Sequence, residues 1–355
     1  MPGAPYTLSP RRPVPVSLPA SEPVAPERTA SERTVPEPVI AFRHASRVRP
    51  AEAPPGARAS SHAGTARAVA QALRPHQWAK NVLVALPLLL AHRTGEPGLI
   101  LDAAVAFAAL SLCASGTYVV NDLTDRDRDR RHPTKRTRPF ASGALSVPFG
   151  VGLAAVLLVA AFALSASVLP AAFTLVLAVY VAVTLAYSFR LKAEPIVDVL
   201  VLAGLYALRV VAGGAATGVP LSEWLLAFSL FFFLGLALLK RYVELRQMET
   251  GAVPSDNGRG YLAADASLVR SVGPATGLFS VLVLALYVTS PEVRVLYERP
   301  VLLWIAIPAF LYWTMRMWLL AHRGRMPDDP VLFAVRDPAS YAVVAVVAAV
   351  VSLAA

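Results

Sequence analysis

Long apolar stretches alternate with short polar segments along most of the chain. Each stretch is close to the roughly 20 residues that an α-helix needs to cross a bilayer. Runs this long and continuous favour helices over the strands of a barrel. We therefore predict an all-α, polytopic membrane protein with about nine spans, at residues 78–92, 98–120, 147–165, 168–188, 196–216, 222–241, 269–290, 300–320 and 338–354.

The composition supports a membrane location. Of the 355 residues, 56% are hydrophobic and only 16% are charged, which is more apolar than is typical of soluble domains. In a soluble protein, the net charge of +10 would suggest nucleic acid as a partner. Here the positive charge lies between apolar spans, where it sets orientation and can hold anionic substrates. We expect membrane lipids as partners and no nucleic acid.

The first 67 residues differ from the rest. They are rich in Pro, Arg and Ala and show no sustained apolar period. Such a segment buries too little surface to offset its chain entropy, so we predict a disordered tail over 1–67 and one transmembrane domain over 68–355. The tail lacks the apolar core of a secretory signal, and we expect it to stay uncleaved.

Positive charge is concentrated in alternate loops. The loops after the second, fourth, sixth and eighth spans are rich in Lys and Arg. The other loops carry few or balanced charges, near residues 93–98, 166–169, 217–222 and 291–299. Because Lys and Arg concentrate on the cytoplasmic side, we predict that the N-terminus and the polar loops are cytoplasmic and that the C-terminus is outside.

Three aspartates and an asparagine follow the second span. Asp122, Asp125 and Asp129 are spaced i, i+3 and i+7, so they share one face if the helix continues. Converging carboxylates repel each other, and Mg²⁺ would relieve that repulsion while keeping positions for water and phosphate oxygens. Asn121 could orient a carboxylate or join the metal ligands. The alternative is a solvated loop of alternating charge, in which arginines pair with the aspartates.

A cationic stretch with two prolines comes next, at residues 130–139. Basic side chains bind phosphate oxygens, and prolines limit the entropy lost when a loop becomes ordered. We predict Lys135 and Arg138 as phosphate ligands. The alternative is that these charges only set the membrane orientation.

A second polar cluster joins spans four and five. It contains Tyr187, Lys192 and Asp198, which we predict to bind substrate. Arg209 follows eleven residues after Asp198, about three turns into an otherwise apolar helix. A charge inside a span is costly and marks a functional candidate by default. Its partner would be a substrate anion or an aspartate, and the alternative is a structural salt bridge.

Three further polar residues lie in the same layer. Lys80 and Asn81 are one turn inside the first span, and Lys240 is near the inner end of the sixth. Several helix ends therefore meet in one polar layer below an apolar bundle. A lipid phosphate with a long tail would require that arrangement, so we predict these three residues to bind substrate.

At these residues the chain resembles the UbiA superfamily of intramembrane prenyltransferases. The hallmark NDxxDxxxD motif is matched by Asn121, Asp122, Asp125 and Asp129. The resemblance extends from about residue 70 onwards and implies an all-helical bundle. It also implies a transferase in which the three aspartates are the catalytic centre and bind Mg²⁺ with a substrate diphosphate.

Residues 74–81, 129–139 and 187–192 are most similar to the branch that contains decaprenyl-phosphate phosphoribosyltransferase. This resemblance implies transfer of 5-phosphoribose from soluble phosphoribosyl diphosphate to a polyprenyl phosphate, a step in cell wall biogenesis. Typical superfamily members carry a second motif, DxxxD, near the start of span five, where Asp198 is here followed four residues on by Leu202. One carboxylate there favours a lipid monophosphate over a lipid diphosphate bridged by two metals.

Two other functions stay open. One is ordinary prenyl transfer, in which a polyprenyl diphosphate loses its diphosphate to an aromatic or other small acceptor. The other is a transporter without enzymatic activity. Only Arg209 favours the transporter, because the other ionisable residues gather at one membrane face and not near the midplane.

Overall fold

The computed structural model describes residues 62–251 and 259–355. Every regular element within these residues is a helix, which confirms the all-α prediction. Most of the predicted disordered tail lies outside the described residues. The first described helix, α1 (His62–Leu73), begins before the predicted domain boundary at residue 68.

Seven helices in the described part are long and apolar enough to cross a membrane. They are α3 (Pro97–Thr124), α6 (Val147–Val168), α7 (Ala171–Phe189), α8 (Val197–Thr217), α9 (Glu223–Glu249), α10 (Ala266–Thr289) with its leading 3₁₀ turn η4 (Ala263–Asp265), and α12 (Ala306–His322) with its leading 3₁₀ turn η5 (Pro300–Ile305). Each one coincides with a predicted span.

The other two predicted spans are shorter, so the count of nine is not confirmed. The first consists of the 3₁₀ helix η1 (Pro75–Ala85) followed by α2 (Leu86–Leu90). A 3₁₀ helix rises about 2.0 Å per residue, so the pair extends about 30 Å, close to the thickness of the hydrocarbon layer. The last is α14 (Pro338–Ala354), with 17 residues. The apolar pattern predicted a helix at both spans, but it did not reveal that the first span is largely a 3₁₀ helix.

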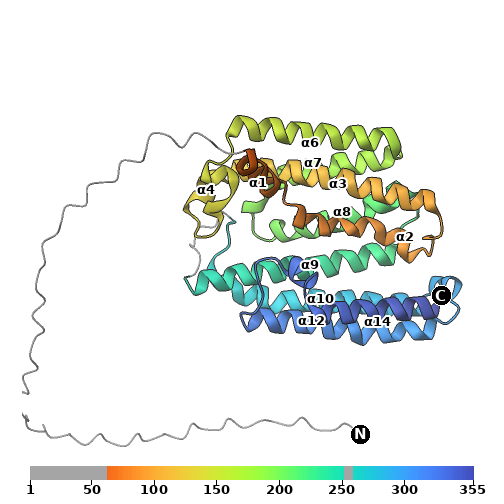
Figure 1. The fold of residues 1–355 in the computed structure, drawn as a ribbon. Coiled ribbons are helices and arrows are strands. Elements are labelled where there is room, and N and C mark those ends of the chain that lie inside the picture. Colours follow the sequence, from red (N-terminus) through yellow and green to blue (C-terminus); the bar gives the residue numbers. More distant parts are fainter. Residues whose placement is uncertain (1–61, 252–258) are drawn as a thin grey trace, which may run out of the picture. The chain divides into compact units, whose positions relative to one another are not determined.

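The long helices run side by side in one bundle (Figure 1). Helix α3 packs against α6 and α7, α8 packs against α7 and α9, and α9 packs against α10. Helices α12 and α14 complete the other side, and α11 (Pro291–Leu296) joins α10 to η5. Short elements connect the long ones: α4 (Arg126–Arg131), η2 (Lys135–Thr137), α5 (Pro139–Ser142), η3 (Leu191–Ala193) and α13 (Pro330–Ala334). The C-terminus and α4 lie at opposite ends of the bundle in Figure 1.

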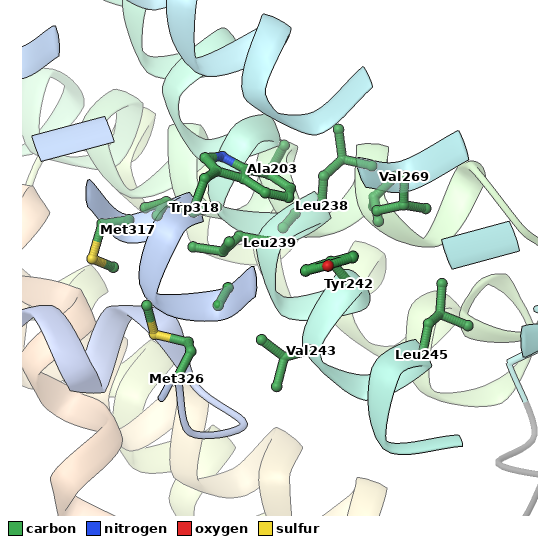
Figure 2. Packing of buried hydrophobic residues seen from close by; sticks show 14 of the residues in the cluster. Ala203, Leu238, Leu239, Tyr242, Val243, Leu245, Val269, Met317, Trp318 and Met326 are labelled. Carbon is green, nitrogen blue, oxygen red and sulfur yellow. The ribbon is translucent and has the colours of Figure 1, made fainter. Parts of the chain in front are cut away.

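An apolar core joins α9 to its neighbours. Tyr242 and Leu239 of α9 pack with Trp318 of α12, Val269 of α10 and Ala203 of α8 (Figure 2). Between helices in a bilayer such packing stabilises through van der Waals contacts and not through removal of apolar surface from water, and it fixes α9 relative to α8. Both helices carry charged residues at the same end of the bundle, and the core holds those residues in register.

A glycine allows η1 to lie directly against α8. A Cβ built on Gly213 would lie 2.1 Å from the carbonyl oxygen of Val84, which only glycine avoids. This close backbone approach brings Asn81 of η1 next to Arg209 of α8, and the two side chains are hydrogen bonded. The packing of η1 is therefore part of how the site is built.

Candidate active site

A cavity of about 340 Å³ lies among η1, α3, α4, α7, α8 and α9. Its described lining contains eight basic side chains and five carboxylates, a formal excess of three positive charges. The basic ones are Arg74, Lys80, Lys135, Arg138, Lys192, Arg209, Lys240 and Arg259. The carboxylates are Asp125, Asp129, Glu244, Asp328 and Asp329. A cavity of this charge suits an anionic ligand.

Helix α3 ends just before the middle aspartate of the motif. Asp125 lies between α3 and α4, yet its N–H donates to the carbonyl of Asn121 (2.9 Å) and its own carbonyl accepts from Asp129 N–H (2.8 Å). Helical hydrogen bonding thus continues across the break. Asn121, Asp125 and Asp129 line the cavity, whereas Asp122 is 2% exposed and is not among the lining residues.

Asp122 and Asp129 share one guanidinium. Arg138 Nη1 lies 2.7 Å from Asp129 and 3.2 Å from Asp122, and Arg74 Nη2 lies 2.6 Å from Asp122. Burial raises the pKa of Asp129, and Arg138 offsets only part of that effect. Arg74 reaches Asp122 from a left-handed backbone conformation (φ 51°), which is uncommon for a residue with a Cβ. The burial of both aspartates argues against a freely solvated loop.

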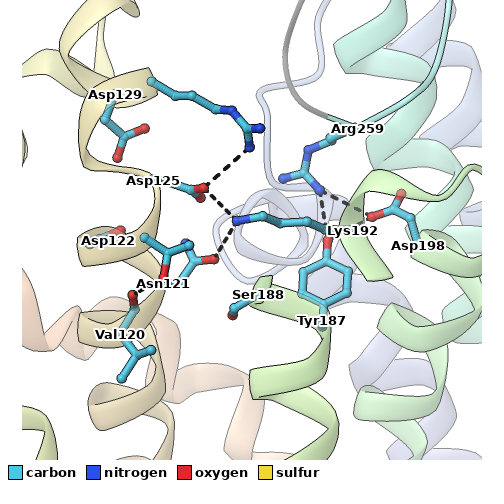
Figure 3. Close-up of polar contacts among 12 residues, drawn as sticks. Val120, Asn121, Asp122, Asp125, Asp129, Tyr187, Ser188, Lys192, Asp198 and Arg259 are labelled. Carbon is cyan, nitrogen blue, oxygen red and sulfur yellow. Dashed lines mark hydrogen bonds and ion pairs between the residues drawn. The ribbon is translucent and has the colours of Figure 1, made fainter. Parts of the chain in front are cut away.

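Asp125 is held by a different cation. Lys192 Nζ, from η3, lies 2.6 Å from Asp125 and 3.4 Å from the side-chain oxygen of Asn121 (Figure 3). Lys135 also lines the cavity, and burial lowers its pKa. The predicted cationic stretch, through Arg138, and the predicted second polar cluster, through Lys192, therefore both meet the aspartate motif in the fold.

Asp198 is fully buried at the start of α8. It accepts hydrogen bonds from Tyr187 (2.8 Å) and Arg259 (3.2 Å; Figure 3). Its other oxygen lies 2.6 Å from Arg241 Nη2. Arg241 also pairs with Glu244. Asp198 is not among the described lining residues, whereas Tyr187 is, so Asp198 reaches the cavity only through its partners.

Arg209 is 5% exposed and is surrounded by neutral groups. It donates to Asn81 (2.9 Å), to the Tyr180 hydroxyl (2.9 Å) and to the Leu205 carbonyl (2.5 Å). Asn81 in turn donates to Ser111 (3.1 Å) and is not among the lining residues. Asn81 thus orients Arg209, which does line the cavity.

Several lining residues were not among the sequence-predicted ligands. Asp329, at the start of α13, lies 2.6 Å from Lys80 and its pKa is lowered, because Lys80 and Lys240 outweigh the opposing effect of burial. Arg74, Glu244 and Arg259 also line the cavity. The available signal for Asp329 was an acidic pair, Asp328-Asp329, inside a loop that is otherwise basic.

Asn121, Asp125 and Asp129 form one side of the cavity, the aspartate wall, and offer oxygen donors of the kind that Mg²⁺ prefers. Within the described residues, no three His, Cys, Asp or Glu side chains form a ready metal site. Two carboxylates and one amide oxygen nevertheless face the cavity from Asp125, Asp129 and Asn121. Such an incomplete set fits a cation that completes its shell with water and substrate oxygens. The predicted roles of Asp122, Asp125 and Asp129 as metal ligands stay predictions.

The chain is similar to several curated proteins. It is 36% identical to nodulation protein NoeC of Azorhizobium caulinodans over 275 residues, 76% of this chain and 87% of that one. It is 40% identical to the uncharacterized protein y4nM of Sinorhizobium fredii over 277 residues, covering 78% of this chain and about half (54%) of that one. It is 42% identical to decaprenyl-phosphate phosphoribosyltransferase of Mycobacterium tuberculosis over 189 residues, 52% of this chain and 62% of that one.

Solved structures share the fold. A UbiA homologue from Archaeoglobus fulgidus, bound to DMAPP and Mg²⁺, aligns with a TM-score of 0.60 at 17% identity, over 80% of this chain and 99% of that one. A structure described for digeranylgeranylglyceryl phosphate synthase aligns with a TM-score of 0.56 at 14% identity, over 82% of this chain and 98% of that one. The model of the UbiA prenyltransferase family matches residues 81–352. The chain is therefore a multi-pass membrane protein that belongs to the UbiA prenyltransferase family.

Proposed function

We propose that this protein is a Mg²⁺-dependent transferase that moves 5-phosphoribose from phosphoribosyl diphosphate to a polyprenyl phosphate of the decaprenyl type. The observation that carries the proposal is the positively charged cavity at the polar end of an apolar bundle. Both substrates are anions, and one of them has an apolar tail. Support also comes from the 42% identity to decaprenyl-phosphate phosphoribosyltransferase over about half of this chain.

The aspartate motif is the proposed diphosphate end of the cavity. Asp125 and Asp129, with Asp122 behind them, would hold Mg²⁺, and Asn121 would add an amide oxygen. A bound Mg²⁺ would neutralise charge on the diphosphate and stabilise it as a leaving group. Further substrate ligands are proposed from the lining: Lys80, Lys135, Arg138, Tyr187, Lys192, Arg209 and Lys240. Asn81 and Asp198 would position these ligands from behind.

The proposed reaction is a displacement at C1 of the ribose. An oxygen of the lipid phosphate forms a bond to C1, the bond between C1 and the diphosphate oxygen breaks, and its electron pair leaves with the diphosphate. The nucleophile is already anionic at neutral pH, so no side chain has to remove a proton. Lys192 and Arg138, which now pair with carboxylates, would turn to the phosphate oxygens and balance the developing negative charge.

We further propose that the N-terminus and the cavity face the cytoplasm and that the C-terminus lies outside. The distribution of Lys and Arg among the loops supports this orientation. The separation of the C-terminus from α4 along the bundle agrees with it (Figure 1). A soluble sugar diphosphate would then enter from the side where it is made.

Prenyl transfer to an aromatic acceptor is the second candidate. Tyr118, Tyr180 and Tyr206 line the cavity, and aromatic faces can stabilise an allylic cation. The chain is also 36% identical to 4-hydroxybenzoate solanesyltransferase of Synechocystis over 127 residues, 35% of this chain and 43% of that one. In this reaction the lipid would carry the diphosphate and the acceptor would be neutral or carry a carboxylate.

A paired assay separates the two candidates. The purified full chain is incubated with Mg²⁺, decaprenyl phosphate and labelled phosphoribosyl diphosphate, and in parallel with a polyprenyl diphosphate and 4-hydroxybenzoate. We expect label in the lipid fraction, reduced about 100-fold or more by Asp125→Ala. Asp127→Ala is the matched control, because Asp127 is 86% exposed in the same motif. A prenylated aromatic product in place of labelled lipid would reject phosphoribosyl transfer.

A further inference from the structure

Arg209 is a buried cation without a carboxylate partner. Within residues 62–251 and 259–355, no Asp or Glu oxygen lies within 4 Å of its guanidinium, and its hydrogen bonds go only to neutral groups. Its other close neighbours are the rings of Tyr180 (5.0 Å) and Tyr206 (5.3 Å). Cation–π contacts compensate a buried charge only in part, because they leave the net charge in place. An anion at this position would complete the site.

The guanidinium also keeps donors available. It carries five N–H groups, of which three are used by Asn81, Tyr180 and Leu205. The Tyr180 hydroxyl accepts one of these bonds and can donate its own proton to a further acceptor. Arg209 and Tyr180 both line the cavity, so their remaining donors can converge on one ligand there.

The surroundings of Arg209 differ from the aspartate wall. Along α8, Arg209 lies eleven residues, or about 16 Å, beyond Asp198, which marks the polar end of that helix. The apolar side chains of Leu202, Leu205 and Leu236 line the cavity together with it. Among the described residues no carboxylate lies within 4 Å of the Arg209 guanidinium, so this position suits a metal-free anion attached to an apolar chain better than a magnesium complex.

We propose that Arg209, with the Tyr180 hydroxyl, binds the phosphate of the lipid acceptor in a metal-independent subsite separate from the diphosphate end. This inference rests on the proposed function. It assigns the two anionic substrates of that function, the soluble diphosphate and the lipid phosphate, to different ends of the cavity. Lys192 and Arg138 serve the soluble diphosphate, and Arg209 serves the lipid monophosphate. Asn81 is a positioning residue, because it reaches the ligand only through Arg209.

Binding without turnover tests the subsite directly. The full chain in lipid nanodiscs is titrated with farnesyl phosphate and with farnesol, in EDTA and without any sugar diphosphate. We expect the wild type to bind the phosphate about 10-fold or more tightly than the alcohol, as charge-assisted hydrogen bonds predict. Arg209→Gln should remove that preference, Arg209→Lys should restore part of it, and Tyr180→Phe should weaken it less.

Arg316→Gln is the matched control. Arg316 lies in a membrane helix but already pairs with Asp337 at 2.7 Å, and it is not among the cavity residues. Its loss should leave the preference for farnesyl phosphate unchanged. Thermal unfolding of every variant reports whether the fold is intact. If Arg209→Gln does not fold, the reduced preference for farnesyl phosphate in Tyr180→Phe still tests the subsite.

Steady-state kinetics give a second, independent result. Arg209→Gln should raise KM for the polyprenyl phosphate about 10-fold or more and leave KM for phosphoribosyl diphosphate unchanged. An unchanged preference for farnesyl phosphate in folded Arg209→Gln, or a change confined to the soluble donor, overturns the subsite. Arg209-dependent binding of farnesyl phosphate in a wild type that transfers no phosphoribose would support the subsite and reject the proposed function.

Discussion

Arg209 and Arg241 are both buried in membrane helices, yet their surroundings are opposite. Arg241 is fully buried, lies 2.6 Å from Asp198 and pairs with Glu244. Arg209 is 5% exposed and contacts only neutral groups among the described residues. One charge is balanced within the protein and the other is not. Burial alone therefore does not distinguish the two arginines, and the proposal that Arg209 binds a ligand rests on its missing counter-charge.

The largest expected effect comes from removing the balanced charge. Arg241→Met should lower the free energy of unfolding by about 3–5 kcal/mol, because it leaves Asp198 and Glu244 with one cationic partner fewer in a buried site. Denaturant unfolding in mixed micelles would measure the loss. The double variant Arg241→Met/Asp198→Leu should recover part of it, and a single variant as stable as the wild type would contradict the structural role of the pair.

The contact that positions Asn81 beside Arg209 should be the next most sensitive. Gly213→Ala places a methyl group 2.1 Å from a backbone oxygen and should cost about 1–3 kcal/mol of stability, with a matching loss of binding of farnesyl phosphate. Gly204→Ala in the same helix is the control, since nothing lies within 4 Å of its added methyl group. Equal stability of the two variants would show that η1 can move away without consequence.

The pH dependence of the free energy of unfolding tests the ion pair between Asp329 and Lys80. Because the pKa of Asp329 is lowered in the fold, its ion pair stabilises the protein above the ordinary carboxyl pKa near 4 and ceases to do so as pH falls through the lowered value. Asp329→Asn should therefore lower stability by about 1 kcal/mol at pH 7. The difference between variant and wild type should vanish well below pH 4, and a constant difference across pH would rule out the ion pair as its source.

The smallest stability effect is expected at Arg209. Arg209→Met removes three hydrogen bonds but also an unbalanced buried charge, so the unfolding free energy of the ligand-free protein should change by less than about 1 kcal/mol. Farnesyl phosphate should then raise the melting temperature of the wild type but not of the variant. A ligand-free variant as unstable as Arg241→Met would remove the contrast between the two arginines.

Much of the fold followed from apolar length and periodicity, and the seven long helices coincide with predicted spans. The first span shows the limit of that reasoning, because the same apolar residues satisfy both α and 3₁₀ geometry. In the fold this span packs its backbone directly against α8 at Gly213. No local pattern at residues 75–85 contains that tertiary contact.

The site was predictable where its residues are close in sequence. The aspartate motif and the cationic stretch up to Arg138 are one continuous segment, and they do meet in the fold. Tyr187 lies in the same predicted cluster as its partner Asp198, but the two arginine partners of Asp198 were not predictable, since Arg241 and Arg259 lie 43 and 61 residues further along the chain. Asp329 was missed for the same reason, as it meets Lys80 across 249 residues.

The ion pairs of the aspartate wall have a thermodynamic consequence. In the structure Lys192 pairs with Asp125 and Arg138 pairs with Asp129, so the charges of the wall are balanced within the protein. Mg²⁺ alone would bind the carboxylates and leave Lys192 and Arg138 without a counter-charge. A diphosphate alone would bind the two cations and leave the carboxylates without one. Arriving together, the two release both sets at once, so each should raise the affinity for the other by the same factor. The wall would then bind the complex of metal and diphosphate more tightly than it binds either component alone.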